Sequence, residues 1–188
     1  MREGTAKGDD LHVTRADIDR IQYACIAARM GDGPQALLVL GPNDGIDLNW
    51  ISAKREVLVT RNGRVVKTYG LEQDVKATVF LTPDPVGGPS GDFAASKEFV
   101  RTLDLEPRHQ DGVVVRSTFE PAGVDEIDIL GARLRTELWQ ERGAAPEIDW
   151  TFVNQYWIDP GSGYVWKSRQ VAAPLLPPIE IIIYRRPA

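Results

Sequence analysis

The dipeptide Asn62-Gly63 constrains the fold more than any other feature, because it lies between two runs rich in β-branched residues. A type I′ turn needs positive φ at both central residues, which Asn tolerates and Gly adopts freely. The stretch Glu56–Leu71 is therefore predicted to form a β-hairpin with a two-residue loop, one face fully buried and the other partly covered. The expected cross-strand pairs are Arg61 with Arg64, Val59 with Val66, and Val57 with Thr68.

Short strand patterns, separated by turns rich in Gly and Pro, recur along most of the remaining chain. A capping box at Thr14 and Asp17 predicts a short helix that ends near Arg20. About ten to twelve strands without a βαβ rhythm predict an all-β fold, an antiparallel β-sandwich or open β-barrel with one or two short helices. Strands are expected at residues 22–29, 35–40, 46–51, 74–81, 98–105, 113–119, 125–130, 132–142, 147–158, 164–171 and 178–185.

Three of these segments carry particular expectations. Ala132–Arg142 fits both a helical face and strand alternation, and we favour a strand because its surroundings are β. Residues 120–123 are expected to separate two strands, and residues 143–146 to form a hairpin loop. Thr82–Asp92 contains three prolines and three glycines, so it is expected to be the longest and most mobile loop, followed by a short helical turn.

Length and composition set broad bounds on the protein. A chain of 188 residues is expected to form one domain over residues 14–188, preceded by a flexible lead-in over residues 1–13. With 43% hydrophobic and 26% charged residues, the composition is that of a globular protein and not of a disordered chain. The net charge of −5 and the lack of a basic run argue against a nucleic-acid partner.

Residues that bind metals or cofactors are sparse. The single cysteine, Cys25, rules out an intrachain disulfide and a cysteine-based zinc cluster, and its apolar surroundings predict a buried thiol. His12 and His109 have no metal-ligand spacing, and no nucleotide-binding or nucleophile motif is present. We therefore predict no metal site and no cofactor.

Carboxylate pairs offer the only basis for an enzymatic alternative, a polysaccharide-modifying enzyme that uses general acid–base chemistry. An acidic protein always contains such pairs, and charged residues on strand faces are mostly solvated. We therefore favour a protein without catalytic residues. The pairs in question are Asp104 with Glu106 and Asp125 with Asp128, together with Asp149 or Asp159 near the C-terminal aromatic residues.

The most distinctive constellation is aromatic and lies in the C-terminal hairpin around residues 159–163. Strand alternation places Trp150, Phe152 and Tyr156 on one face and Trp157 on the other. A four-residue loop would pair Trp157 with Trp166, whereas a five-residue loop would pair Tyr156 with Trp166. Rings beside cationic and amide side chains can stack on sugars, but core packing is the more common use of large rings. The predicted ligand-binding residues are Tyr156, Trp157, Trp166 and Arg169.

Two groups of segments resemble the YjbF/GfcB family. The first comprises Leu37–Gly41, Trp50–Ala53 and Leu58–Leu71. The second comprises Asn154–Pro160, Val165–Gln170 and Pro174–Pro178. The resemblance runs in order from about Tyr23 to Pro187, and it is loose between residues 82 and 145.

Members of that family resemble small outer-membrane lipoproteins that serve capsule and exopolysaccharide production. The resemblance implies a non-enzymatic role on the periplasmic side of the outer membrane, with polysaccharide or polysaccharide-export proteins as partners. A carrier of a lipid-linked precursor is a further alternative, which would need an interior cavity lined by isoleucine, valine and tryptophan side chains.

The family's lipidated N-terminal cysteine has no counterpart in this sequence, because Cys25 lies within a predicted strand. No apolar run reaches the length of about 18 residues that a membrane helix needs, and the N-terminus lacks the apolar core of a signal peptide. Taken alone, this is compatible with a cytoplasmic protein or with a leader that has been removed. With the resemblance, we expect that the leader and anchoring cysteine are missing, so that the membrane is contacted only through an absent lipid anchor.

Overall fold

The structure is a computed structural model that describes residues 11–43, 45–87, 98–107 and 109–187. Most of the lead-in predicted over residues 1–13 therefore lies outside the described residues. The helical turn expected from Asp92 also lies outside them, as does the second half of the loop over residues 82–92.

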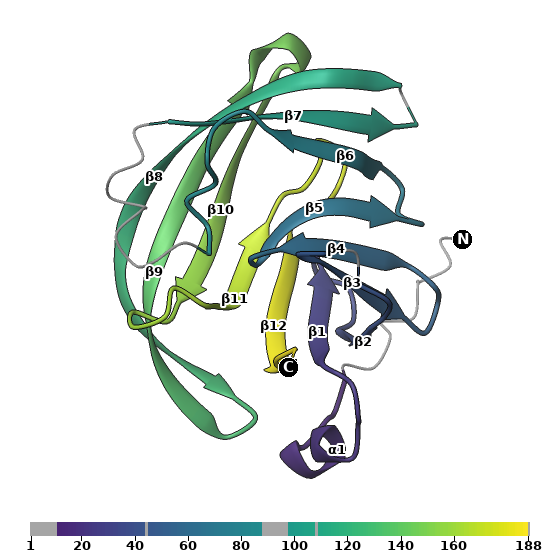
Figure 1. The fold of residues 1–188 in the computed structure, drawn as a ribbon, viewed down its shortest axis with the longest axis vertical. Helices are drawn as coiled ribbons and strands as arrows, with labels where there is room; N and C mark the ends of the chain where they lie inside the picture. The colour runs from purple at the N-terminus through teal and green to yellow at the C-terminus, as the bar shows by residue number, and fades with distance from the viewer. Residues whose placement is uncertain (1–10, 44, 88–97, 108, 188) are drawn as a thin grey trace, which may run out of the picture.

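Twelve antiparallel strands form a single sheet that curls into a nearly closed barrel (Figure 1). Each strand pairs with its neighbours in sequence except at one junction, and the first strand also pairs with the last. The all-β prediction is confirmed, and of its two alternatives the barrel is observed. The elements are α1 (Arg15–Asp19), β1 (Cys25–Met30), β2 (Ala36–Leu40), β3 (Asp47–Ser52), β4 (Val57–Arg61), β5 (Arg64–Tyr69), β6 (Asp74–Phe80), β7 (Phe99–Glu106), β8 (Gln110–Ile129), β9 (Ala132–Ala145), the 3₁₀ turn η1 (Pro146–Ile148), β10 (Trp150–Ile158), β11 (Val165–Gln170) and β12 (Ile179–Arg185).

The exceptional junction is a seam between β5 and β6, where no backbone ladder joins the described strands. Side chains bridge this seam instead. Thr78 Oγ1 donates a hydrogen bond of 2.7 Å to the carbonyl oxygen of Val66, and Thr68 Oγ1 accepts one of 3.0 Å from the amide of Val75. The barrel is therefore closed by ladders everywhere except at this seam.

The hairpin of β4 and β5 has the predicted turn, with φ of 52° at Asn62 and 92° at Gly63, and Arg61 pairs with Arg64. A register shift between Val59 and Thr60 then places Val59 opposite Lys67 and Val57 opposite Tyr69, so the other two predicted pairs are wrong. The cause is a β-bulge, which adds one residue to β5 and interrupts its alternation. As a result, the consecutive residues Val65 and Val66 are both buried.

The long hairpin of β8 and β9 corrects two expectations. Residues 120–123 do not separate two strands, because β8 continues through them with a register shift between Pro121 and Gly123. Proline cannot donate to a ladder and is tolerated at such bulges. The strand favoured over Ala132–Arg142 is confirmed, and β9 extends to Ala145, which moves the connection to β10 past the predicted loop at 143–146.

The smaller expectations near the N-terminus hold. Helix α1 begins after Thr14, and both hydrogen bonds of the predicted capping box with Asp17 are present. Cys25 is a free, fully buried thiol in β1. Among the described residues, no helix has the length and apolar character that a membrane crossing requires.

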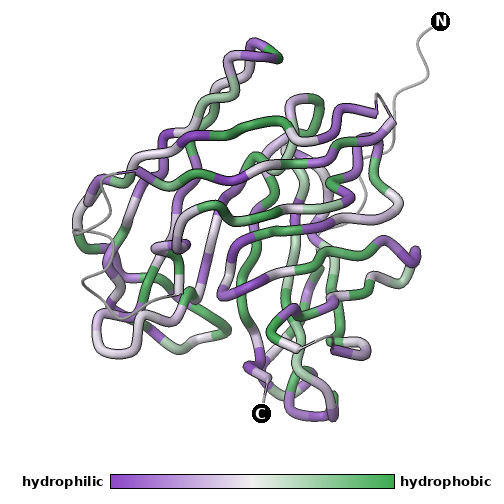
Figure 2. Tube along the Cα trace, turned by 45° about the horizontal axis from the view of Figure 1, so that its top comes forward, coloured by the Kyte–Doolittle hydropathy of each residue, from purple (hydrophilic) through white to green (hydrophobic). Residues whose placement is uncertain are grey.

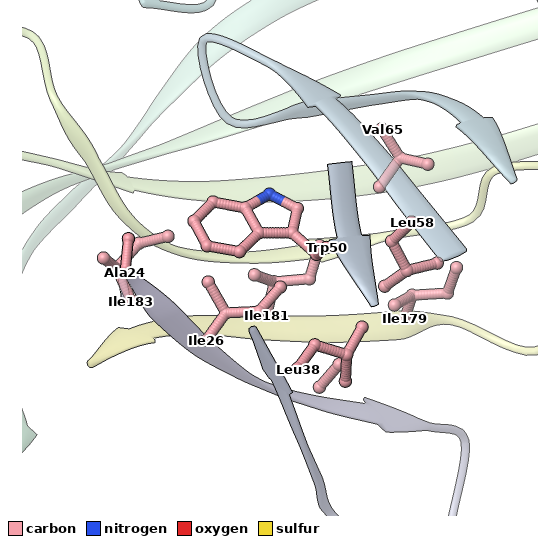
Figure 3. Packing of buried hydrophobic residues seen from close by; sticks show 10 residues of the cluster. Ala24, Ile26, Leu38, Trp50, Leu58, Val65, Ile179, Ile181 and Ile183 are labelled. Atoms are coloured by element: carbon pink, nitrogen blue, oxygen red, sulfur yellow. The ribbon is translucent and has the colours of Figure 1, made fainter. Parts of the chain in front are cut away.

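The interior is filled by two large hydrophobic clusters. One packs the inward side chains of β1 to β5 and β12 around Trp50, which is 1% exposed (Figure 3). The other joins β6 to β10 with the connector after β11, and includes Phe152 and Leu176. Hydrophobic and hydrophilic residues alternate along many strands in Figure 2, as one buried and one solvated face require.

A third cluster lies on the outside of the barrel, where the far end of the β8–β9 hairpin covers β10 to β12. It is built from Ile127 and Ile129 of the hairpin and from Trp157, which is 8% exposed. Trp157 Nε1 donates a hydrogen bond of 2.7 Å to Asp125, and the ammonium of Lys167 lies 4.8 Å from the indole centroid. The outward-facing tryptophan of β10 is thus covered by the chain itself.

Candidate functional site

A cavity of about 420 Å³, here called the mouth cavity, is lined by residues at the end of the barrel where Arg186 and Pro187 lie. Its walls come from β3, β4, β11, the end of β12 and the turns around Asn62 and Ser162. Trp50 belongs both to the cluster in Figure 3 and to the cavity wall, so the hydrophobic core closes the inner end. The apolar wall residues are Ile46, Leu48, Trp50, Tyr164, Val165 and Ile183.

Two glycines with positive φ determine how closely the chain packs around this cavity. A Cβ on Gly63 would lie 2.6 Å from Cβ of Val165, and a Cβ on Gly87 would lie 2.2 Å from Cβ of Asn62. Their φ angles are 92° and 78°, which L side chains rarely adopt. The Asn62-Gly63 turn is therefore wedged between β11 and the segment that follows β6, and it fixes the inner edge of the mouth cavity.

An arginine in contact with two aromatic rings marks the outer edge of the mouth cavity. The guanidinium carbon of Arg186 lies 4.0 Å from the ring centroid of Tyr164 and 3.9 Å from that of Trp166. The two rings pack edge to face, with centroids 5.1 Å apart. Burial raises the pKa of Tyr164 although Arg186 opposes this, so the hydroxyl is protonated at neutral pH. Arg186 is the only charged side chain among the described residues that line the cavity.

The turn between β10 and β11 holds one side of the cavity rim in place. Oδ1 of Asp159 accepts hydrogen bonds from the amides of Gly161 and Ser162 and from the Ser162 hydroxyl. These bonds, chiefly those from Ser162, lower the pKa of Asp159, and the charge of Arg186 lowers it further. The rim is therefore a preformed turn with an ionised carboxylate beside the cavity.

Deeper in the barrel lies a cluster of four buried charges, here called the buried ion network: Arg64, Asp84, Arg101 and Glu141. Glu141, which is fully buried, accepts hydrogen bonds of 2.7 Å from both arginines. Asp84 binds Arg64 through two further bonds of 2.7 and 2.9 Å. Burial favours the neutral form of Glu141, but the two arginines outweigh it and hold its pKa well below the usual value.

Neutral side chains complete this network. Tyr156 donates a hydrogen bond of 3.0 Å to Glu141, and Asn154 donates one of 2.9 Å. Gln170 accepts from the amide of Val65 and donates to the carbonyl of Gly63, so it connects β11 with the β4–β5 turn. Among the described residues, every buried side-chain nitrogen and oxygen has a hydrogen-bond partner. Two positive and two negative charges balance, which is the condition for stable burial of ions.

The structure does not bring the four sequence-predicted site residues onto one surface. Tyr156 points into the buried ion network and is 0% exposed, and Trp157 lies under the β8–β9 hairpin. Arg169 is exposed on β11, away from the residues lining the mouth cavity. Trp166, half-buried, is the member that reaches the cavity rim, through its contact with Arg186.

The predicted hairpin register is also corrected. Ile158 pairs with Val165 and Trp157 pairs with Lys167, so Trp166 is the extra residue of a β-bulge and has no partner of its own. Neither of the two pairings considered for Trp166 is observed. At the bulge, the strict alternation of side chains between the two faces of β11 is interrupted, and the indole of Trp166 lies beside Tyr164.

Sequence reasoning missed Arg186, and it counted Tyr164 among the C-terminal aromatic residues without including it in the predicted site. The pair Arg185-Arg186 is too short to be a basic patch, so it gave no signal by itself. The available signal was the antiparallel pairing of the last two predicted strands, which aligns β12 with β11. Since Lys167 pairs with Ile182, the residues that follow β12 lie beside the start of β11.

The carboxylate pairs considered for catalysis are engaged in local contacts. Asp104 accepts from the amide of Gly112, and Glu106 is paired with Lys76. Asp125 binds Trp157, and Asp128 accepts from the amide of Gly131.

A second large groove, about 530 Å³, crosses the outer surface of β8 to β10 and contains one carboxylate, Glu98. The mouth cavity has none among its described lining residues. Within the described part of the chain, no group of three or more His, Cys, Asp or Glu could hold a metal ion.

Comparison with known proteins gives consistent results. A relative from Escherichia coli K12, "Uncharacterized lipoprotein GfcB", is 28% identical over 183 residues, which cover 96% of this chain and 85% of the relative. "Uncharacterized lipoprotein YjbF" from the same organism is 26% identical over 161 residues, 85% of this chain and 74% of the relative. The crystal structure of the hypothetical lipoprotein YmcC, also from E. coli K12, superimposes with a TM-score of 0.77 at 25% identity, covering 94% of this chain and 90% of that one.

The model of one protein family, described as "Group 4 capsule polysaccharide lipoprotein gfcB, YjbF", matches residues 2–183. The match includes both strands of the Asn62-Gly63 hairpin and ends within β12, so it covers nearly all of the barrel. The resemblance noted in the sequence is therefore confirmed, and the chain belongs to the YjbF family of group 4 capsule polysaccharide lipoproteins.

Proposed function

We propose that this domain binds a capsular or exopolysaccharide chain on the periplasmic side of the outer membrane and does not transform it chemically. The mouth cavity is the binding site in this proposal. The observation that carries it is the cavity of about 420 Å³ edged by an arginine that contacts two aromatic rings. Membership of a capsule polysaccharide lipoprotein family supplies the biological setting.

The composition of the cavity suits a sugar. Pocket volumes for small ligands run from about 300 to 1,000 Å³, so one or two sugar rings fit. Tyr164 and Trp166 offer ring faces and edges for the C–H groups of a sugar. Thr60, Asn62 and Ser162 add polar side chains to the wall, which can bond to hydroxyl groups.

The absence of a chemical step is supported by the distribution of carboxylates. A glycosidase needs two carboxyl groups on opposite sides of the scissile bond, about 5 to 10 Å apart. Neither of the two large cavities is lined by two carboxylates among the described residues. Glu141 is ionised and fully buried, and both of its oxygens are bound to arginines. It is thus occupied by structural bonds.

A carrier of a lipid-linked precursor is the second candidate, favoured by the apolar wall around Ile46, Leu48 and Ile183. Against it, the adjoining space beside Trp50 and Ile181 has a volume of only about 10 Å³. A long acyl chain would therefore have to remain outside the barrel. For attachment, we propose that the natural protein carries an N-terminal lipid anchor, as the lipoprotein family implies.

Titration of tryptophan fluorescence tests glycan binding directly. Purified exopolysaccharide from the protein's own source should give a saturable spectral shift, because Trp166 lies at the cavity rim. Tyr164→Ala should abolish the shift while the far-ultraviolet circular dichroism spectrum stays unchanged. Arg169→Ala is the matched control, because this exposed residue lies outside the cavity lining and its loss should leave binding intact.

Two other outcomes would redirect the proposal. If the folded protein shows no shift with the polysaccharide, and calorimetry also detects no binding, the partner is a protein of the export machinery and pull-down experiments replace titration. If Arg169→Ala abolishes binding and Tyr164→Ala does not, the site lies on the outer face of β11, where Arg169 is exposed.

A further inference from the structure

We propose that the mouth cavity selects an acidic glycan, whose sugar carboxylate is bound by Arg186 while the sugar ring lies against Tyr164 and the apolar wall. This inference rests on the proposed glycan binding and names the class of polysaccharide that is bound.

The first argument is charge. The protein carries a net charge of −5, yet the only charged side chain among the described lining residues is positive. A cation at the edge of a cavity attracts an anion, and because Arg186 is exposed this attraction is screened by salt. A neutral glycan would leave this charge unused.

The second argument is orientation. The guanidinium carbon of Arg186 lies 3.9 and 4.0 Å from the centroids of two rings that are inclined by 75° to each other, so the side chain lies in the corner between them. The N–H donors of a guanidinium lie in its plane in a fixed fork. A carboxylate presents two oxygens in the matching geometry and accepts two parallel hydrogen bonds. Because contact with the rings restricts the side chain in advance, little rotamer freedom is lost on binding.

The third argument is the state of the neighbouring carboxylate. Asp159 lies close enough for Arg186 to lower its pKa, but no ion pair within 4.0 Å joins the two side chains. Oδ1 of Asp159 is occupied by three hydrogen bonds within the turn. Among the residues that the structure describes, no carboxylate therefore neutralises Arg186 by direct pairing. Asp159 weakens the attraction for an anion, so its removal should strengthen binding.

The experiment compares two forms of the same glycan. Oligosaccharides are prepared from the exopolysaccharide of the protein's own source, and in half of the sample the carboxyl groups are reduced to primary alcohols. Calorimetry should show that the native form binds the wild-type protein roughly tenfold or more tightly than the reduced form, as expected for a charge-assisted bidentate contact. Native binding should weaken as sodium chloride is added.

Variants assign this preference to one side chain. Arg186→Gln should bind both forms equally and lose the salt dependence, Arg186→Lys should retain part of the preference, and Arg169→Gln should behave as wild type. Asp159→Asn should bind the native form more tightly. Circular dichroism of each variant shows whether it is folded. If a variant is unfolded, the salt dependence of binding by the wild-type protein still tests the proposal.

The outcomes separate the inference from the function on which it rests. Equal binding of both glycan forms by the wild-type protein would overturn acidic selectivity and leave glycan binding in place, as would a source polysaccharide that contains no acidic sugar but still binds. Failure of both forms to bind would overturn the proposed function itself. A preference that persists in Arg186→Gln would place the anion elsewhere.

Discussion

The buried ion network and the edge of the mouth cavity use the same pair of elements, arginine and aromatic rings, with opposite results. Arg64 lies 4.7 Å from the ring centroid of Phe99 and 5.5 Å from that of Tyr156, and two carboxylates neutralise it. Arg186 lies closer to its two rings but is exposed and has no ion pair among the described residues. Contact with rings therefore does not distinguish a structural arginine from a binding one. The two are distinguished by whether carboxylates neutralise the guanidinium and whether solvent reaches it.

The largest expected effect comes from unbalancing the buried ion network. Glu141→Gln removes one of its two negative charges and leaves Arg64 and Arg101 with only Asp84, so the free energy of unfolding should fall by about 3–5 kcal/mol. Urea denaturation measures the change. Glu120→Gln is the matched control, since Glu120 pairs with Arg142 at a site where both side chains are more than half exposed, and it should cost less than about 1 kcal/mol. Equal losses in the two variants would contradict the comparison.

Lowering the pH should destabilise the wild-type protein through the same buried ion network. The folded-state pKa of Glu141 lies well below 4.5, so its ion pairs stabilise the protein fully above that pH, and the contribution is lost as pH falls through the folded-state pKa. The urea midpoint of the wild-type protein should therefore drop between about pH 5 and pH 3 more steeply than that of Glu141→Gln. Parallel curves would mean that Glu141 is not the group responsible.

Tyr156→Phe sharpens the comparison further, because Tyr156 is both a network member and a sequence-predicted binding residue. The variant removes the hydroxyl whose single proton is shared between Glu141 Oε2 at 3.0 Å and Gln170 Oε1 at 3.3 Å, and should lower the free energy of unfolding by about 1–2 kcal/mol. Glycan binding, measured by calorimetry, should be unchanged. If the variant lost glycan binding while its stability was unchanged, Tyr156 would instead be a binding residue, as the sequence predicted.

The smallest effect on stability is expected at the cavity edge. Arg186→Gln removes an exposed contact between a cation and two rings, which is worth about 0.5–1 kcal/mol. The thermal midpoint should therefore change little, whereas Arg64→Gln in the buried network should lower it strongly. Differential scanning calorimetry of the two variants compares the regions directly. A large loss in Arg186→Gln would show that the contact is structural.

Local rules predicted the parts of the fold that local chemistry determines. Positive φ at Asn62 and Gly63 fixed the β4–β5 turn, and alternation placed Trp150, Phe152 and Tyr156 on the inner face of β10. The bulge between Val59 and Thr60 could not be predicted in the same way. It depends on how the hairpin packs inside a closed barrel, which involves residues far away in sequence.

The candidate site was harder to predict from the sequence, because it also depends on contacts between residues that are far apart in the chain. Trp157 is covered by a hairpin in which its hydrogen-bond partner, Asp125, is 32 residues away, and strand alternation alone cannot predict such a cover. Arg186 reaches Trp166 only because β12 pairs with β11. Aromatic composition indicated the correct end of the chain, but the residues that remain accessible there were determined by long-range packing.

The pairing of β1 with β12 also has a consequence for how this protein folds. Ala28 of β1 lies opposite Ile181 of β12. The ladder between these two strands therefore cannot form until the last strand has been synthesised and has left the ribosome. Closing so long a loop costs more entropy than any hairpin and is typical of slow-folding β proteins. The seam between β5 and β6, by contrast, separates strands that are adjacent in sequence. The barrel thus has a backbone ladder between β1 and β12, the strands from the two ends of the chain. It lacks a ladder between β5 and β6, which are adjacent in sequence.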